Sequence, residues 1–529
     1  VASVFTGAVV NLASGMGGLG GLQDTLISIE NVFGTKLNDS IEGDNGDNIL
    51  SGDAGSDTLN GGGGNDLLIA GGGGVFGATD VLNGDAGNDT FLVGSGVFEI
   101  DGGEGRDTLD FSVATEQADG GGETLSVIID LRRETVSRET ESSTVVWADD
   151  GTQSERQFDG QSIRPEDVLR SDPLYALDGD DIALRLPGKD EDDPNLPSFA
   201  IEIETSIVTR PNEPSTVTGI EDVIGTAGND FLTGNDADNT FFGEDGDDVL
   251  RGREGDDTLD GGTGRDTAYF EGDQGRYTLT LGTDGPTVTD RTGENGNDRL
   301  IDIELLDFEI ETSGDLFDLE IFGGLTGLSG SELEAFIELY IAYFNRAPDA
   351  VGLSFWGTAF ANGVTLEESA AFFIDQEETR ATYPEGLSNS DFATAVYANV
   401  LGRVADQVGF DFWVGALNDR SVGRDQFILA ILGGAKADPP ANASQEFIEQ
   451  QLADRVYLEN KTDIGTYFAV TRGMSDIDNA IAVMQTFDGS ADSIEAAIAA
   501  TDAFYASAFD AEDGEFLLQI VGVLDNPFA

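Results

Sequence analysis

A nine-residue cycle of glycine, aspartate and an apolar residue repeats in two blocks of this chain. Nine copies of the cycle begin with a glycine in the same phase: Gly34, Gly43, Gly52, Gly61, Gly225, Gly234, Gly243, Gly252 and Gly261. Glycine adopts positive φ without strain, so the first half of each copy predicts a tight turn. The remaining residues predict a very short strand. Two copies then complete one coil, and successive coils stack as parallel strands about 4.8 Å apart.

Two further positions of the cycle carry side chains of a fixed kind. The sixth position holds a carboxylate in Asp39, Asp57, Asp66, Asp89, Asp107, Asp230, Asp248, Asp257 and Asp266. The eighth position holds an apolar residue that is expected to point into the core: Ile41, Leu50, Leu59, Leu68, Phe91, Leu109, Leu232, Phe241, Leu250 and Leu259. Matched positions over nine copies make unrelated Gly/Asp turns a poor explanation of the pattern.

Stacked coils would bring each carboxylate at the sixth position close to the equivalent carboxylate on the next coil. Two like charges so close together are unfavourable unless a cation lies between them. Calcium binds six to eight oxygens and accepts both carboxylates and backbone carbonyls, which is the set that stacked turns offer. The predicted metal ligands are the nine aspartates of the sixth position together with Asp47, Asp238, Asn48 and Asn239.

The two blocks are related by a duplication. Residues 29–34 recur as residues 220–225, an offset of 191 residues (220 − 29), and Asp39 corresponds to Asp230. Asn48 corresponds to Asn239, so each block has an amide instead of a carboxylate in its second copy. Weaker or incomplete calcium sites are expected there. The duplication predicts two separate rolls.

The cycle is clearest in residues 261–266, with the sequence GGTGRD, and it resembles the calcium-binding nonapeptide repeat of RTX (hemolysin-type) proteins. The resemblance implies a β-roll fold, folding induced by calcium and export by a type I secretion system. Calcium and a type I exporter are therefore the expected partners. The expected location is secreted, either extracellular or at the cell surface.

Composition excludes several classes of function. The chain has 101 acidic and 26 basic residues and a net charge of −75, so it lacks the excess of Lys and Arg that nucleic-acid binding needs. Histidine and cysteine are absent, which excludes serine–histidine triads, histidine zinc sites and disulfides. No apolar run reaches 18 residues, so membrane insertion is not expected.

The pattern divides the 529 residues into five regions. Residues 1–110 predict a β lead-in and the first roll, 111–219 a β-rich insertion, and 220–316 the second roll with a strand cap. Residues 328–475 predict a helical repeat domain, and 476–529 a helical C-terminal segment. The predicted fold class is a multidomain β + α protein, with two parallel calcium β-rolls and a β-rich insertion followed by an all-α C-terminal domain.

The helical region contains an internal repeat of its own. Five residues recur at an offset of 57 (397 − 340): Tyr340, Arg346, Gly352, Phe355 and Trp356 correspond to Tyr397, Arg403, Gly409, Phe412 and Trp413. The aromatic pairs are expected to pack between helices rather than to bind a ligand. The two arginines are expected to secure helix ends, with Asp349 and Asp406 as partners.

Helix boundaries and the C-terminal segment carry further signals. Ser331 with Glu334, and Thr365 with Glu368, predict capping boxes. The region resembles a helical domain of unknown function that often accompanies RTX repeats in secreted bacterial proteins. No basic residue follows Arg472, and the acidic, Ala-rich segment up to Ala529 is similar to the uncleaved signals of type I secretion substrates.

Three hypotheses of function follow. The first is a non-enzymatic structural protein of the cell surface or extracellular matrix, S-layer-like or adhesive, which assembles with itself or binds another surface protein or a glycan. The alternative is the calcium-dependent carrier region of a larger exported enzyme or toxin, since the chain begins at Val1 rather than Met. The third is a glycan-active site in the insertion that uses Glu134 with Asp149 as a carboxylate pair.

Overall fold

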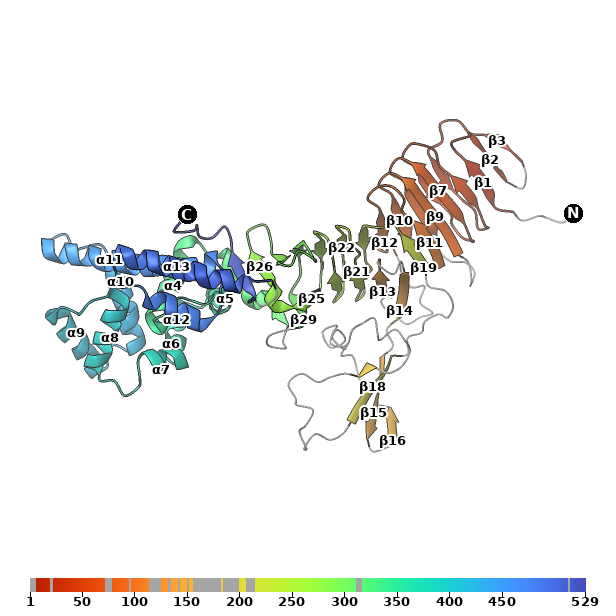
Figure 1. The fold of residues 1–529 in the computed structure, drawn as a ribbon. Helices are drawn as coiled ribbons and strands as arrows, with labels where there is room; N and C mark the ends of the chain where they lie inside the picture. Colours follow the sequence, from red (N-terminus) through yellow and green to blue (C-terminus); the bar gives the residue numbers. More distant parts are fainter. Residues whose placement is uncertain are drawn as a thin grey trace. The chain divides into compact units, whose positions relative to one another are not determined.

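The chain divides into two units of different character in this computed structural model. The structure describes residues 6–19, 22–71, 79–94, 97–113, 125–131, 135–140, 143–149, 152–155, 182–183, 199–205, 215–310, 316–511 and 514–529. The first unit comprises Val1–Gly272 and Glu294–Phe317, and the second comprises Asp273–Gly293 and Asp318–Ala529. The first unit is built from β-strands and the second mainly from helices (Figure 1).

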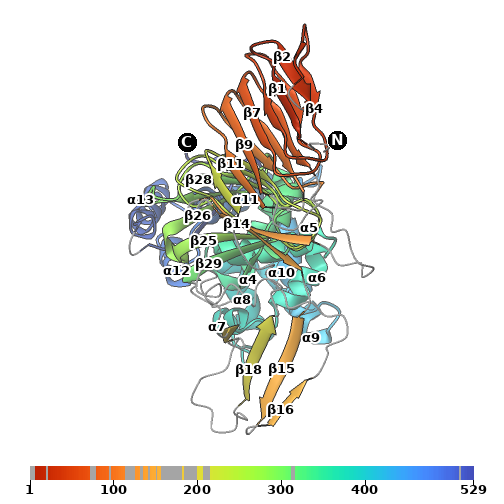
Figure 2. The same cartoon turned by 90° about the vertical axis from the view of Figure 1, so that its right-hand side faces the viewer.

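Two long sheets make up most of the first unit. The first sheet contains, in spatial order, β3 (Asp24–Thr25), β2 (Met16–Leu19), β1 (Ala8–Asn11), β5 (Ser40–Glu42), β7 (Thr58–Gly63), β9 (Thr79–Ala86), β11 (Val97–Asp101), β19 (Ser215–Thr218), β14 (Thr135–Thr140), β13 (Leu125–Asp130), β21 (Phe231–Thr233), β23 (Val249–Arg251), β25 (Thr267–Asp273) and β29 (Leu305–Ile310). The second sheet contains β4 (Asn31–Phe33), β6 (Ile49–Ser51), β8 (Leu67–Gly71), β10 (Thr90–Val93), β12 (Thr108–Asp110), β20 (Asp222–Ile224), β22 (Thr240–Phe242), β24 (Thr258–Asp260) and β28 (Asn297–Ile301). Figure 2 shows the N-terminal strands of the stack, β1 to β9, side by side.

The register of the strands places the eighth residue of every copy in one core. Ile41 lies opposite Leu59 in the first sheet, and Leu50 lies opposite Leu68 in the second, in parallel pairs. All ten predicted eighth-position side chains are at most 1% exposed. The predicted alternation of turn and short strand, with the eighth side chain inward, is therefore confirmed.

The two glycine-rich blocks form one continuous stack, and the prediction of separate rolls is wrong in this respect. In the second sheet, β12 of the first block pairs directly and in parallel with β20 of the second, with Leu109 opposite Val223. In the first sheet, β19 pairs with β11, and the antiparallel strands β14 and β13 continue the sheet to β21. Pairing across the junction leaves no bare strand edge between the two blocks, where an edge would otherwise invite association.

The insertion also contains a small antiparallel sheet. Its strands, in spatial order, are β16 (Thr152–Glu155), β15 (Ser143–Asp149), β18 (Phe199–Thr205) and β17 (Ile182–Ala183). The described strands of residues 111–219, among them β13 and β15, agree with the predicted β-rich insertion. Glu134, one half of the candidate carboxylate pair, lies outside the described residues.

The second unit is a helical domain that also contains three paired strands. Its helices are α3 (Leu319–Phe322), α4 (Gly330–Phe344), α5 (Ala350–Ala361), α6 (Leu366–Phe373), α7 (Glu377–Thr382), α8 (Asn389–Leu401), α9 (Gln407–Asp419), α10 (Arg424–Lys436), α11 (Gln445–Thr466), α12 (Ile477–Gln485) and α13 (Ala491–Ala508). Shorter helical turns are η1 (Gln274–Arg276), η2 (Gly324–Gly327) and the π-helix η3 (Tyr467–Thr471), and the short strand β30 (Phe317–Asp318) precedes α3.

Strands from both ends of this unit meet in its sheet. Strand β26 (Tyr277–Leu281) pairs with β27 (Thr287–Asp290) on one side and, in parallel, with β31 (Leu517–Ile520) on the other. The sequence predicts β26 and β27 as part of the cap of the second roll, and it predicts a wholly helical C-terminal segment. Both of these strands are present as predicted, whereas β31 adds a strand to the C-terminal segment, because it pairs with β26, more than 200 residues earlier in the chain.

Two details of the helix ends also differ from the prediction. Helix α4 begins two residues earlier than expected, with Ser329 and Glu332 forming the capping box in place of Ser331 and Glu334. The second predicted box, Thr365 with Glu368, is confirmed at the start of α6. An acidic or hydroxyl N-cap satisfies amides that have no partner within the helix.

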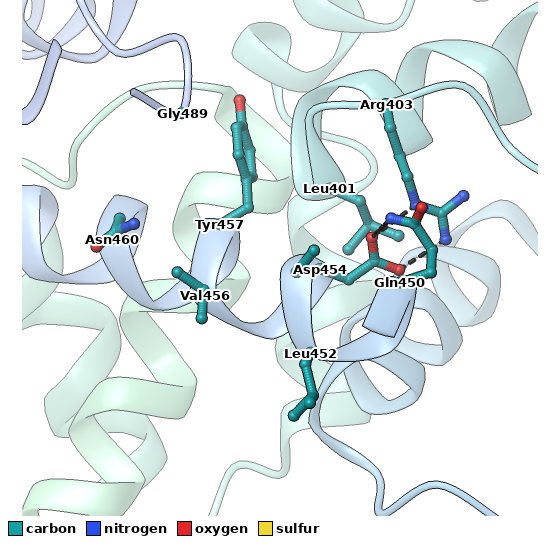
Figure 3. A pocket seen from close by; sticks show the side chains of 10 residues that line it. Leu401, Arg403, Gln450, Leu452, Asp454, Val456, Tyr457, Asn460 and Gly489 are labelled. Atoms are coloured by element: carbon teal, nitrogen blue, oxygen red, sulfur yellow. Dashed lines mark hydrogen bonds and ion pairs between the residues drawn. The ribbon is translucent and has the colours of Figure 1, made fainter. Parts of the chain in front are cut away.

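The repeated arginines form ion pairs that hold helices together. Arg346 is buried, and it donates to Glu378 at 2.7 and 3.1 Å and lies 3.1 Å from its predicted partner Asp349. Arg403 forms its ion pair with Asp454 on α11 instead, through two bonds of 2.6 Å (Figure 3). Its predicted partner Asp406 caps α9 by accepting from the Gly409 N–H at 2.9 Å.

The repeated aromatic pairs are only half buried. Trp356 packs edge-on against Phe373 with ring centroids 5.1 Å apart, and Trp413 packs against Phe427 at 5.4 Å. The neighbouring phenylalanines of both pairs are exposed, Phe412 to 66%. The prediction of core packing is therefore confirmed for the tryptophans and wrong for Phe355 and Phe412.

Candidate metal centre

The carboxylates at the sixth position form ladders along the stack. The backbone N–H of Asp230 donates to Oδ1 of Asp248 at 2.7 Å, and the N–H of Asp248 donates to Oδ1 of Asp266 at 2.8 Å. Each bond joins equivalent residues on neighbouring coils. The same bond recurs in both blocks, from Asp39 to Asp57, Asn48 to Asp66, Asp66 to Asp89, Asp89 to Asp107, and Asn239 to Asp257. One oxygen of each receiving carboxylate is therefore fixed in place by the backbone.

The ladders include four acidic residues that the sequence analysis missed. The N–H of Asp57 donates to Asp80 at 2.9 Å, and the N–H of Asp257 donates to Asp298 at 3.0 Å. Glutamates accept the equivalent bond elsewhere. The backbone N–H of Asp107 donates to Glu221, and that of Asp266 donates to Glu304. Residues 293–300 read GENGNDRL and repeat the pattern of the cycle around Asp298, but they begin 32 residues (293 − 261) after Gly261 and are therefore out of its nine-residue phase. The glutamates each follow an isoleucine, as Glu30 does at the start of the first block.

The second oxygen of seven ladder carboxylates is buried and has no hydrogen-bond partner. These oxygens are Oδ2 of Asp57, Asp66, Asp89, Asp107, Asp248, Asp257 and Asp266. All seven side chains are at most 2% exposed. Leaving one buried acceptor unpaired costs about 1–3 kcal/mol and more when the group is charged. Seven such oxygens in one stack therefore favour either a bound cation or protonation of the carboxylates.

The unpaired oxygens face the glycine turns, next to backbone carbonyls. A Cβ atom built on Gly243 would lie 2.2 Å from Oδ2 of Asp248 and 2.5 Å from the carbonyl oxygen of Gly261 on the next coil. A Cβ on Gly61 would lie 2.4 Å from Oδ2 of Asp66 and 2.8 Å from the carbonyl oxygen of Gly84. Only glycine at the first position allows this convergence of oxygens.

Burial makes the charged form of these carboxylates unfavourable. Burial, reinforced by Asp230 and Asp266 as neighbouring charges, raises the pKa of Asp248 to about 9. Burial likewise raises the pKa of Asp257 and of Asp266 to about 7. A bound cation would reverse this tendency, because it favours the charged form of each ligand.

The predicted ligands Asp47 and Asp238 lie in a separate, exposed row. Oδ1 of Asp47 accepts from the N–H of Asn65 at 2.8 Å, and Oδ1 of Asp238 accepts from the N–H of Asp256 at 2.9 Å. This outer row occupies the fifth position of the cycle and joins equivalent residues of neighbouring coils, as the inner ladders do.

Four predicted ligands have partners for the oxygen that faces the turn. Oδ2 of Asp39 accepts from the N–H of Thr35, and Oδ2 of Asp230 accepts from the N–H of Thr226 at 2.6 Å. The side-chain oxygens of the two asparagines accept in the same way. The backbone N–H of Asp44 donates to Oδ1 of Asn48 at 2.8 Å, and the backbone N–H of Asn235 donates to Oδ1 of Asn239 at 3.0 Å.

The donor set fits calcium better than a transition metal. The available groups are carboxylate and carbonyl oxygens, which calcium prefers, and the chain has neither histidine nor cysteine. No three acidic side chains converge on one point among the described residues. A calcium ion would therefore take one or two carboxylate oxygens from the ladder, and carbonyl oxygens of the turns would supply most of its ligands.

Neither the third candidate site nor a membrane span is visible in the structure. Glu134 and the side chain of Asp149 lie outside the part of the chain that the structure describes. Among the described helices, none combines the length and the apolar character that crossing a membrane requires.

Comparison with known proteins identifies both parts of the chain. Residues 33–74, 77–97, 215–250 and 233–268 match the RTX calcium-binding nonapeptide repeat. Residues 370–437, from α6 to α10, match a domain of unknown function, DUF4214. The comparison with curated proteins found no match to the chain. The chain thus carries RTX calcium-binding nonapeptide repeats in parallel β-roll sheets, followed by a helical region that contains a match to DUF4214.

Proposed function

We propose that this chain is a secreted protein whose β-roll folds when calcium binds outside the cell. The observation that carries the proposal is the set of seven buried Oδ2 atoms without hydrogen-bond partners. Each faces a glycine turn rich in carbonyl oxygens. Calcium supplies the positively charged partner that these oxygens lack, and its preference for six to eight oxygen ligands suits the turn.

The charge of the chain makes the calcium dependence strong. A net charge of −75 destabilises any compact state through self-repulsion. Extracellular modules bind calcium with Kd values of about 10⁻⁴–10⁻³ M. At ten times Kd, each site stabilises the folded state by about 1.4 kcal/mol. Several coupled sites then decide whether the roll folds, and scarce cytosolic calcium would leave it unfolded for export.

Far-UV circular dichroism of the full chain tests this proposal. The strand signal should be weak in EGTA and should rise cooperatively on addition of about 5 mM calcium, several times the largest expected Kd. Magnesium at the same concentration is the control, since it demands a smaller, near-octahedral site and gives up its water reluctantly. Equal strand content in EGTA and in calcium would contradict the proposal.

We further propose a non-enzymatic role in assembly at the cell surface or in the extracellular matrix. Support comes from the helical unit, where three apolar side chains spaced four residues apart are exposed: Val404 (77%), Val408 (82%) and Phe412 (66%). Val408 and Phe412 lie one turn apart on α9, and exposed apolar neighbours of this kind are typical of contact surfaces. A second copy of the chain or another surface protein could cover them.

Sedimentation velocity in calcium tests the assembly role. The wild type should form species larger than a monomer, and Val408→Ser with Phe412→Ser should shift the distribution toward monomer. Exposed Val521 on the same unit provides a matched control, since Val521→Ser should leave assembly unchanged. A monomeric wild type at all calcium and protein concentrations would contradict the role.

A further inference from the structure

The turns of the stack fall into two conformational classes, set by the residue after the first glycine. In seven turns this second residue has positive φ: Asp53 (69°), Gly62 (102°), Asp85 (71°), Gly103 (103°), Glu244 (79°), Arg253 (79°) and Gly262 (89°). These turns are the same seven whose sixth-position aspartate has an unpaired Oδ2. The correspondence between turn conformation and unpaired oxygen holds in every one of the seven.

The other class contains four turns. Their second residues, Thr35, Asp44, Thr226 and Asn235, are not among the described residues with positive φ. Each turns its backbone N–H toward the side-chain oxygen at the sixth position and donates to it. In the third of these turns, the Thr226 hydroxyl lies a further 3.0 and 3.1 Å from the two oxygens of Asp230. In these four turns the backbone supplies the hydrogen-bond donor that the sixth-position oxygen lacks in the other seven.

Backbone strain distinguishes the two classes further. Positive φ is unfavourable for any residue with a side chain, yet Asp53, Asp85, Glu244 and Arg253 all adopt it. In that conformation no N–H of the second residue reaches the aspartate. A ligand that binds the freed oxygen would compensate for the strain, whereas the four relaxed turns need none.

Building on the proposed calcium function, we propose that calcium occupies only the turns with positive φ at the second position. The four metal-free turns are the first two of each block, and each pair makes up one complete coil, residues 34–51 and 225–242. A metal-free coil therefore opens the first block and also divides the calcium array in two. Asp57, Asp66, Asp89 and Asp107 precede the second such coil, and Asp248, Asp257 and Asp266 follow it.

The dividing coil is joined to the first block by a cation of the protein itself. Arg106, in the last turn of the first block, forms a two-bond ion pair with Asp222. Its guanidinium also donates to the carbonyl oxygen of Asp238 at 2.8 Å and to the Thr240 hydroxyl at 2.7 Å. These acceptors are a carboxylate, a carbonyl and a hydroxyl, the kinds of oxygen that calcium binds.

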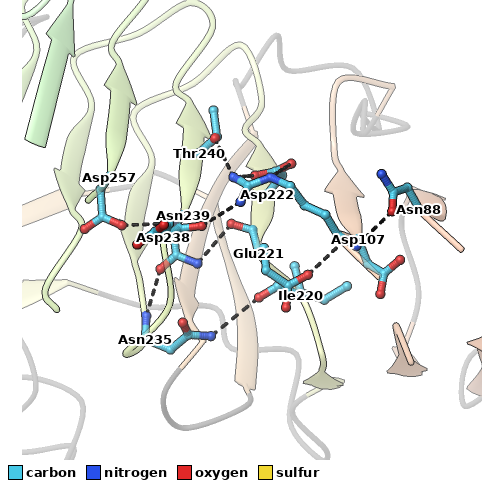
Figure 4. A network of polar contacts seen from close by, with 11 residues as sticks. Asn88, Asp107, Ile220, Glu221, Asp222, Asn235, Asp238, Asn239, Thr240 and Asp257 are labelled. Carbon is cyan, nitrogen blue, oxygen red and sulfur yellow. Dashed lines mark hydrogen bonds and ion pairs between the residues drawn. The ribbon is translucent and has the colours of Figure 1, made fainter. Parts of the chain in front are cut away.

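Side-chain amides complete the hydrogen bonding of the same coil. Nδ2 of Asn239 donates to the carbonyl oxygen of Glu221 at 3.0 Å (Figure 4). A carboxylate at this position could not donate this bond. Both oxygen and nitrogen of Asn239 therefore have partners within the protein, and the position that the sequence predicts as a weakened calcium site is satisfied without a metal.

Counting bound calcium in two neighbouring variants tests the proposal. Asp230→Asn and Asp248→Asn change equivalent, fully buried residues of adjacent coils on one ladder. Native mass spectrometry of the full chain at saturating calcium should show at least one ion fewer in Asp248→Asn and the wild-type number in Asp230→Asn. Far-UV circular dichroism checks that each variant folds. Loss of an ion in Asp230→Asn, as in Asp248→Asn, would overturn the proposal.

A gain-of-site variant keeps the test decisive if Asp230→Asn does not fold. The double change Asn235→Gly with Asn239→Asp gives the turn the glycine and the carboxylate of the calcium class. It should bind one ion more than the wild type, and an unchanged number would overturn the proposal. A wild type that binds no calcium would instead contradict the proposed function, so the two failures are distinguishable.

Discussion

The backbone N–H of Asp248 donates to Oδ1 of Asp266 at 2.8 Å, one coil further along the stack, while Oδ2 of Asp266 is buried without a partner. The first contact orients the carboxylate, and the second oxygen is thereby presented to the glycine turn. Repetition of this relationship along both ladders converts a sequence repeat into an array of oxygen-lined turns. Its energetic consequence is that the folded roll is stabilised by anything that neutralises these carboxylates, a bound cation or a proton.

Removing one ladder carboxylate should weaken calcium-dependent folding. We expect Asp257→Asn to raise the calcium concentration at the midpoint of folding at least threefold, about 0.7 kcal/mol, because one charged ligand is lost. Asp238→Asn is the matched control. Its exposed side chain accepts one amide bond that asparagine can also accept, so the midpoint should not change. Calcium titration followed by circular dichroism measures both, and equal shifts in the two variants would contradict the assignment of Asp257.

A methyl group at the first position of the cycle should destroy a turn. In Gly243→Ala the new Cβ would lie 2.2 Å from Oδ2 of Asp248 and 2.5 Å from a backbone carbonyl oxygen. Neither contact can relax without moving the ladder, so we expect the calcium midpoint to rise and the melting temperature of the roll to fall. Gly415→Ala on the exposed face of α9 meets no atom within 4 Å. It should stabilise its helix by about 0.5–1 kcal/mol. Differential scanning calorimetry distinguishes the two results.

The calcium-free roll should become more stable as the pH falls. Burial raises the pKa of Asp89 and Asp107 to about 6 and that of Asp248 to about 9, from 3.8. The folded state therefore binds more protons than the unfolded state. This contribution to stability is fully present below about pH 3.8 and is lost as the pH rises through about 6 to 9.

Circular dichroism of the calcium-depleted chain, recorded between pH 4 and 9 in steps of about one pH unit, checks this pH dependence. Strand content should be highest at the acid end and should fall toward pH 9. With calcium present the sign reverses, because protons compete for the same oxygens and the calcium midpoint should rise as the pH falls. A strand signal that is constant or rises with pH in the calcium-free chain would be inconsistent with buried, unpaired carboxylates.

The helical unit should depend on its buried arginine. Arg346 is 1% exposed and donates two bonds to Glu378. Replacing Arg346 with methionine leaves the Glu378 carboxylate without its partner. We expect the free energy of unfolding to fall by about 2 kcal/mol, less than for a fully buried pair, because Glu378 is partly solvated. Arg380→Met removes two exposed ion pairs, 3.3 Å to Glu385 and 3.8 Å to Asp375, and should cost about 0.5 kcal/mol or less. Denaturant unfolding followed by tryptophan fluorescence compares them.

Periodicity made the core of the roll and its ladders predictable from the sequence. A nine-residue cycle specifies the inward side chain in every copy, and Leu50, Leu68 and Leu250 are fully buried as expected. The ladder residues that follow a break in the cycle were not predicted. Asp80 follows the interruption at residues 72–78, and Asp298 follows an excursion from residue 273 to 293 that belongs to the helical unit. Their ladder bonds depend on stacking rather than on local sequence.

Long-range contacts could not be read from local patterns. Arg106 forms an ion pair with Asp222 across 116 residues, and it adds to the strand pairing that joins the two blocks. The two turn classes could not be predicted from the sequence, because they depend on the backbone conformation of the second residue. That residue is Asp or Glu in some turns of the calcium class and Asp or Asn in some relaxed turns. Asp53 and Asp44 differ in φ and not in chemistry.

Hydrogen exchange of the full chain, read by mass spectrometry in EGTA and in calcium, tests the central claim most directly. If unpaired carboxylate oxygens make the roll depend on calcium, amides of residues 52–71 and 243–268 should exchange rapidly in EGTA and become protected when calcium is added. Amides of α4 and α11 should be protected in both conditions, since the helical unit contains none of these oxygens among its described residues. Equal, slow exchange of residues 243–268 with and without calcium would contradict the claim.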